Sequence, residues 1–213
     1  MGYLSRAISS LLDVLSPPAC LACDARAEGK PFCPDCWAPL TLSRPTRLDC
    51  APLVVLGAYA EPLSTAIVRF KYQGRPELSR PLARLLAPEL DDTLLPRDAV
   101  LVPVPLHPRR LASRGYNQAA LLAQELALLR QRKCQPRLLR RAKETERQVG
   151  KSQAERRENP DGAFELRQSG PARVVLVDDV VTTGSTVRAC AQALAAGGIQ
   201  LSAVVALAHA EQR

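Results

Sequence analysis

Apolar residues form two kinds of pattern along the chain, short continuous runs and longer segments with helical spacing. Continuous apolar runs are typical of strands buried on both faces of a parallel sheet. They predict strands at 53–60, 99–104, 174–177 and 201–208, with a shorter strand at 137–139. Helical spacing predicts helices at 62–72, 77–90, 118–130 and 187–196. Because strands and helices alternate, we expect an α/β fold with a mainly parallel sheet and flanking helices.

The length of 213 residues suits one α/β domain and a small additional module, and 46% apolar residues supply a core. No run approaches the roughly 18 apolar residues of a membrane span. Residues 3–15 have the spacing of an amphipathic helix, interrupted by polar residues that a signal peptide would lack. We expect this helix to pack on the protein itself, with a membrane surface or a partner as the alternative, and a cytoplasmic protein without a membrane span.

Four of the seven cysteines form two closely spaced pairs. Cys20 and Cys23 make the first pair, and Cys33 and Cys36 make the second. Two such pairs complete a tetrahedral zinc site, and in the cytoplasm metal is favoured over disulfides or redox pairs, which are the alternatives. With four cysteine ligands the ion has no open position, so its role would be structural. We therefore predict a zinc-binding module at 1–50 and the α/β domain at 51–213.

Two adjacent carboxylates, Asp178 and Asp179, follow the apolar run at 174–177. This places them at the carboxyl end of a strand, where open α/β sheets bind ligands. The free N–H groups of the next helix, with the hydroxyls before it, are suited to a phosphate. Carboxylates accept hydrogen bonds from vicinal hydroxyls, so ribose beside a phosphate is the natural ligand. The candidate phosphate-binding residues are Val181, Thr182, Thr183, Gly184, Ser185 and Thr186.

This segment resembles the 5-phosphoribosyl-1-pyrophosphate (PRPP) motif of the type I phosphoribosyltransferases. The resemblance implies that the two acidic residues contact the ribose 2′ and 3′ hydroxyls and that the following loop binds the 5′-phosphate. The alternative is a Rossmann-like turn in which the acids are incidental. Consecutive strand residues point to opposite faces, so Asp178 and Asp179 can reach one sugar only if the chain is already turning there.

Positive charge is concentrated in one part of the chain. Residues 97–157 hold 15 Lys and Arg against 5 Asp and Glu, whereas the whole chain has a net charge of +8. Within this part Arg109, Arg110 and Arg114 follow the predicted strand 99–104, so they should lie at the same sheet edge as the aspartates. Arginine forks onto phosphate oxygens, so these residues are candidates for the pyrophosphate of PRPP, or alternatively for an acidic partner. His107 is the one titrating candidate nearby.

Further motifs occur in a fixed order along nearly the whole chain. They are the four-cysteine module, FKYQG at 70–74, PVPLHPRRLASRGYNQA at 103–119, ERQVGKSQAERRENPDGAF at 146–164 and the VDDVVTTGST run. Together they resemble the ComF family of competence-associated, phosphoribosyltransferase-like proteins. The resemblance implies a type I phosphoribosyltransferase fold, a zinc ribbon, PRPP binding at 178–186 and, in some members, uptake of single-stranded DNA beside a helicase partner. Lys71 of the FKYQG motif joins the candidate substrate-binding residues.

Two classes of function fit these patterns. The first is an enzyme that transfers phosphoribose to an unidentified nucleophile, with Mg²⁺ accompanying the pyrophosphate and with Asp178 and Asp179 as the catalytic residues. The second is a protein that binds PRPP or single-stranded nucleic acid without turnover, which the basic segment favours. A zinc-ribbon adaptor whose other domain is a relic is a third possibility. Polar residues 141–159 are predicted to be a long loop, either a lid or disordered.

Overall fold

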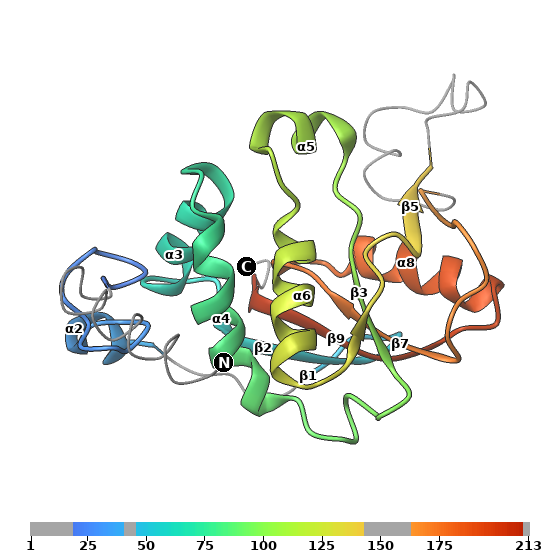
Figure 1. The fold of residues 1–213 in the computed structure, drawn as a ribbon, viewed down its shortest axis with the longest axis horizontal. Coiled ribbons are helices and arrows are strands. Elements are labelled where there is room, and N and C mark those ends of the chain that lie inside the picture. Colours follow the sequence, from blue (N-terminus) through green and yellow to red (C-terminus); the bar gives the residue numbers. More distant parts are fainter. Residues whose placement is uncertain (1–18, 41–45, 143–162, 211–213) are drawn as a thin grey trace, which may run out of the picture.

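A mainly parallel β-sheet forms the centre of the computed structural model, which describes residues 19–40, 46–142 and 163–210 (Figure 1). Its strand order is β1-β2-β9-β7-β3-β4, and β8 also pairs with β9. The strands are β1 Thr46–Arg47, β2 Pro52–Ala58, β3 Val100–Pro103, β4 Lys133–Cys134, β7 Arg173–Val177, β8 Val180–Val181 and β9 Gln200–His209. β1 runs antiparallel to β2, and the other pairs in this sheet are parallel. The predicted α/β class is therefore confirmed.

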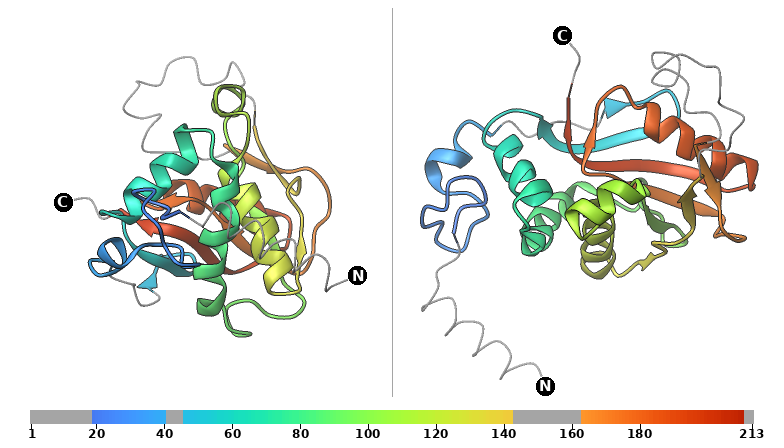
Figure 2. Two further views of the ribbon diagram at one scale, coloured as in Figure 1. Left: turned by 60° about the vertical axis from the view of Figure 1, so that its left-hand side comes forward. Right: turned by 90° about the horizontal axis from the view of Figure 1, so that it is seen from above.

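Helices cover both faces of the sheet, because successive strand residues point in opposite directions. Val175 and Val177 pack on one face with helices α3 Leu63–Tyr72, α4 Ser79–Leu86 and α6 Gln118–Leu129. Val174 and Leu176 pack on the other face with helix α8 Ser185–Ala196 (Figure 2, right). The antiparallel hairpin of β5 Leu139–Arg141 and β6 Phe164–Leu166 also contributes to this second core. The four long apolar runs are thus strands buried on both sides.

Some predicted elements have different bounds in the structure. The predicted helix 77–90 is α4 with a short 3-10 helix on each side, η1 Pro76–Leu78 and η2 Ala87–Glu89. The α-helix ends before Pro88, because proline has no backbone N–H to donate. The predicted strand 137–139 lies two residues later, as β5. The predicted helix at residues 3–15 lies outside the described residues, as does nearly all of the predicted loop 141–159.

One helix at the sheet edge was missed by the sequence patterns. Residues 108–114, which lie outside the predicted helices, form helix α5 Pro108–Arg114, and none of its residues is buried. Because a helix without a buried face has no apolar period, its sequence carried no helical signal. α5 projects from the sheet beside the end of α3 (Figure 1). Within the part of the chain that the structure describes, no helix combines the length and the apolar character needed to cross a membrane.

Candidate functional site

Asp178 and Asp179 lie where the chain leaves β7 at the carboxyl edge of the sheet. Asp178 still donates its backbone N–H to the Val205 carbonyl of β9 at 2.9 Å, and Leu207 donates to the Asp179 carbonyl at 3.0 Å. The Asp179 N–H also donates to Asp178 Oδ1 at 2.8 Å. The chain bends at Asp179, and both residues line one cavity of about 240 Å³. The bend therefore allows neighbouring residues to face one ligand.

Lys71 brings a cation to this carboxylate pair from the end of α3. Its Nζ lies 2.8 Å from Asp179 Oδ1, and the two side chains are each 14% exposed. Burial and the neighbouring charge of Asp179 raise the pKa of Asp178 to about 8, although the Asp179 N–H and the Lys71 ammonium oppose this shift. A protonated Asp178 can donate as well as accept a hydrogen bond at neutral pH. The pair is therefore suited to vicinal hydroxyls.

The turn after the carboxylates leads into α8. Gly184 is the residue before the helix, and its φ of 73° is one that other residues rarely adopt. Ser185 donates its backbone N–H to Thr183 Oγ1 at 3.4 Å. Thr182 and Thr186 line the 240 Å³ cavity, so hydroxyls and the N-terminus of a helix lie beside the carboxylates. Of the other predicted residues, Val181 is buried, Thr183 and Gly184 belong to the turn, and Ser185 begins α8; the last three do not line the cavity.

The basic side of the cavity comes from α5 and the residues before it. His107, Arg110 and Arg114 line it, whereas Arg109 does not. The imidazole of His107 caps α5 by accepting the Arg109 N–H at Nδ1, at 3.2 Å. Arg114 lies 4.6 Å from the centre of the Tyr72 ring and donates to the Tyr72 hydroxyl at 2.9 Å. Two of the three predicted arginines therefore line the same cavity as the carboxylates.

Three residues outside the predicted set of site residues also contribute to the site. Tyr72 and Asn117 line the cavity. Asn117 donates to the Val104 carbonyl at 3.0 Å and accepts at the start of α6, so it fixes the strand end against the helix. Tyr116 donates its hydroxyl to the Phe70 carbonyl at 2.6 Å and thereby holds the end of α3. Asparagine before an apolar helix is an N-cap signal that could have located this junction.

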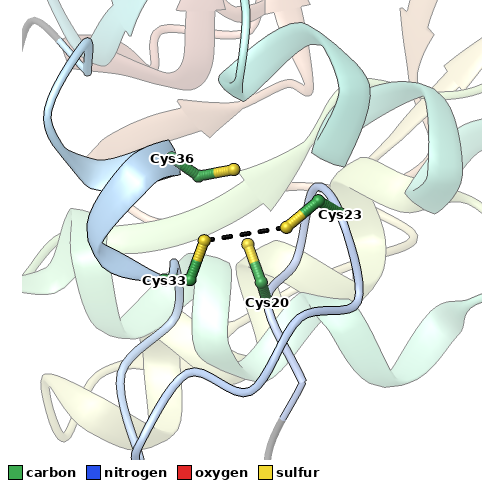
Figure 3. A group of neighbouring side chains, drawn as sticks. All are labelled: Cys20, Cys23, Cys33 and Cys36. Carbon is green, nitrogen blue, oxygen red and sulfur yellow. Dashed lines mark hydrogen bonds between the residues drawn. The ribbon is translucent and has the colours of Figure 1, made fainter.

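The four predicted cysteine ligands meet in the amino-terminal module, which includes helix α2 Pro34–Trp37 (Figure 3). The sulfur atoms of Cys20, Cys23, Cys33 and Cys36 all lie within 4.8 Å of one another, and all four are free thiols. Zn–S bonds of about 2.3 Å in a tetrahedron separate the sulfurs by roughly 3.8 Å, so the cluster fits zinc. Burial alone would raise the pKa of Cys20, but backbone hydrogen bonds lower it to about 6, which favours the thiolate.

Comparisons with known proteins match the two parts of this chain. The double zinc ribbon domain family matches residues 11–60, which include all four cysteines. The phosphoribosyl transferase domain family matches residues 111–213, which include the two aspartates and the turn after them. The structure and these matches together establish a four-cysteine zinc ribbon and a phosphoribosyltransferase domain with a mainly parallel sheet.

Relatives along nearly the whole length decide the family. Competence protein F of Haemophilus influenzae is 35% identical over 206 residues, which cover 90% of this chain and 90% of the relative. The chain belongs to the ComF family. The ComF relative named DNA utilization protein YhgH in Escherichia coli is 36% identical over 84% of this chain and 85% of its own length. Competence protein ComFC of Bacillus subtilis is 29% identical over 64% of this chain and 55% of its own length.

Proposed function

We propose that the chain binds PRPP in the 240 Å³ cavity and transfers its phosphoribosyl group. The observation that carries the proposal is the juxtaposition in one cavity of a carboxylate pair, the start of α8 and three arginines, Arg110, Arg114 and Arg141. Asp178 and Asp179 would hold the ribose hydroxyls, and Thr182 and Thr186 would contact the 5′-phosphate. The match to the phosphoribosyl transferase domain family over these residues supports the same ligand.

In the transfer, the bond between ribose C1 and the pyrophosphate oxygen breaks, and pyrophosphate leaves with the electron pair. The acceptor forms the new bond to C1 and gives up its proton. Arg110 and Arg114 are placed to receive the negative charge that builds on the leaving group. The acids among the lining residues are Asp178 and Asp179, and Lys71 holds one oxygen of Asp179. The lining therefore suits Mg²⁺ that is held mainly by substrate oxygens, where it would neutralise the pyrophosphate.

Calorimetric titration of PRPP with Mg²⁺ tests the site directly. We expect saturable binding to the zinc-loaded protein and its loss in an Asp178→Asn/Asp179→Asn variant. An Asp91→Asn/Asp92→Asn variant is a matched control, because it removes another adjacent acidic pair that does not line the cavity. Equal affinity in the two double variants would overturn the assignment of the aspartates. No binding by the folded wild-type protein would overturn PRPP as the ligand.

A second candidate function is binding of single-stranded DNA, which would link this chain to the DNA uptake that the names of its relatives indicate. A second cavity of about 500 Å³ favours it, since Arg137, Arg140 and Arg167 are among its lining residues. These exposed arginines lie around the β5–β6 hairpin, and Arg140 pairs with Glu165 at 2.6 Å. Such a basic surface suits a phosphate backbone. Arg109 and Arg110 of the basic segment beside the aspartates are the alternative place for the DNA.

The salt dependence of DNA affinity distinguishes binding at the β5–β6 hairpin from binding beside α5. Each phosphate contact contributes about 0.7 to the slope of log affinity against log salt concentration for single strands. We expect an Arg137→Ala/Arg167→Ala variant to lose about 1.4 from this slope and an Arg109→Ala/Arg110→Ala variant to lose less. The reverse order would place the DNA beside α5, and absent binding would remove this candidate function. A helicase partner remains a prediction from the family resemblance.

A further inference from the structure

Arg69 of α3 connects the zinc-binding module to the rest of the chain. Its side chain is only 11% exposed, although it carries a permanent charge. Its guanidinium donates to the Leu21 carbonyl at 3.2 Å and to the Ala22 carbonyl at 2.9 Å, and it pairs with the Asp24 carboxylate. A largely buried arginine with three acceptors holds its partners in one fixed geometry.

The two carbonyls that Arg69 contacts belong to the metal-binding loop itself. Leu21 and Ala22 are the residues between the ligands Cys20 and Cys23. Their carbonyls can accept from one guanidinium only while this short loop keeps the conformation in which both cysteines face the metal. Both residues are buried in the same core as α3. The module lies directly beside α3, as Figure 1 and the right-hand view of Figure 2 show.

The other end of this connection is the candidate PRPP site. Two residues after Arg69, Lys71 reaches Asp179, and the next residue, Tyr72, also lines the cavity. An α-helix is stiff over such a short distance, so a displacement of Arg69 moves Lys71 as well. Tyr116 holds the Phe70 carbonyl on one side of the helix end. The zinc-binding loop, through Arg69, provides a separate attachment on the side of the module.

We propose that Arg69 is a positioning residue that makes PRPP binding depend on the zinc-loaded state of the module. The proposal rests on the proposed function, because it names what controls that same cavity. The four-cysteine site has no open position for chemistry, but its metal holds the loop that Arg69 contacts. The ion therefore acts on the cavity through α3 and not through any contact with the ligand.

A purely structural role for Arg69 makes a different prediction. If Arg69 only attaches the module, its loss lowers thermal stability while the folded, zinc-loaded protein keeps its full affinity for PRPP. If Arg69 positions Lys71, affinity falls even where zinc content and folding are retained. The amides at 69–73 should then exchange faster with solvent, because the end of α3 has lost its attachment to the zinc-binding loop.

The experiment compares zinc-loaded wild type with Arg69→Ala, Arg69→Lys and Arg84→Ala. Arg84 is an exposed arginine in α4 that does not line the cavity, so it controls for loss of charge. Zinc content, PRPP affinity by calorimetry and hydrogen exchange are measured on each protein. We expect affinity about tenfold lower for Arg69→Ala, within the roughly 5- to 150-fold range of coupled sites. Lysine should restore only part of it, because an ammonium cannot fork onto all three acceptors. Arg84→Ala should bind as wild type.

Several outcomes would overturn the proposal. Wild-type affinity in Arg69→Ala with full zinc content would show that the contact does not position the site. Unchanged exchange at 69–73 after a chelator removes zinc from the wild type would show that the metal does not reach α3. If wild type binds no PRPP, the proposed function fails separately, and exchange at 69–73 in zinc-free protein and in Arg69→Ala still decides the coupling. Faster exchange in both samples would support the coupling between the zinc site and the end of α3.

Discussion

Replacing Lys71 with methionine removes the cation from the carboxylate pair while nearly keeping the side-chain volume. The ion pair between Lys71 and Asp179 has a 2.8 Å separation and 14% exposure on each side. Loss of one partner from a fully buried pair costs about 3–5 kcal/mol, whereas an exposed pair contributes about 0–1 kcal/mol. Because this pair borders a cavity that admits water, we expect Lys71→Met to lower the free energy of unfolding by about 2 kcal/mol, or the Tm by roughly 4–8 °C.

A double-mutant cycle in urea isolates the ion pair from other effects of the substitution. Asp179→Asn removes the negative charge, so Lys71→Met should cost much less in that background than in the wild type. We expect a coupling energy of about 1.5 kcal/mol, and little effect of Lys133→Met, a substitution of an exposed lysine in β4. Two single effects that add within about 0.5 kcal/mol would refute the inference that Lys71 stabilises the carboxylate pair.

Three other perturbations have expected outcomes. Burial beside Asp179 raises the pKa of Asp178 from 3.8 to about 8, so the folded chain retains a proton that the unfolded chain releases, and stability falls as pH rises through that interval. In Asp178→Asn, the free energy of unfolding measured in urea should fall over the same pH interval by at least about 1.4 kcal/mol less than in the wild type. An unchanged fall would contradict the assignment of this pH dependence to Asp178. Metal analysis should find about one zinc per chain and its loss in Cys20→Ser/Cys33→Ser; a folded double variant that retains zinc would exclude the four-cysteine site. Gly184→Val should cost about 1–2 kcal/mol in thermal unfolding and Gly184→Asn less, because asparagine tolerates a φ of 73°; equal costs would argue against backbone strain.

The parts of the site that sequence could predict are those determined by neighbouring residues. A buried run followed by acids, hydroxyls and a helix places Asp178 and Thr182 in one local unit, whatever the rest of the chain does. The bend at Asp179 is also local, and a hydrogen bond between the adjacent residues Asp178 and Asp179 accompanies it. Likewise, the spacing of the four cysteines was sufficient to predict their cluster, because one ion fixes all four positions.

The parts that sequence could not predict depend on contacts between distant segments. The ion pair of Lys71 with Asp179 requires α3 to end over the edge of the sheet, which no spacing within the FKYQG motif specifies. The motif marked Lys71 as a candidate without giving it a partner. The sequence could not show that Arg110 lines the cavity and Arg109 does not. This difference arises from α5, because consecutive side chains of a helix point about 100° apart. The contacts of Arg69 with the zinc-binding loop belong to the same class.

The central place of β9 has a consequence for how the chain is made. β9 lies between β2 and β7, and it follows every other described strand in the sequence. During synthesis the edges of β2 and β7 that later pair with it are therefore open until residues 200–209 leave the ribosome. The sheet therefore cannot be completed before the last strand is made. Until then the unpaired edges of β2 and β7 can bind chaperones or pair with strands of other chains.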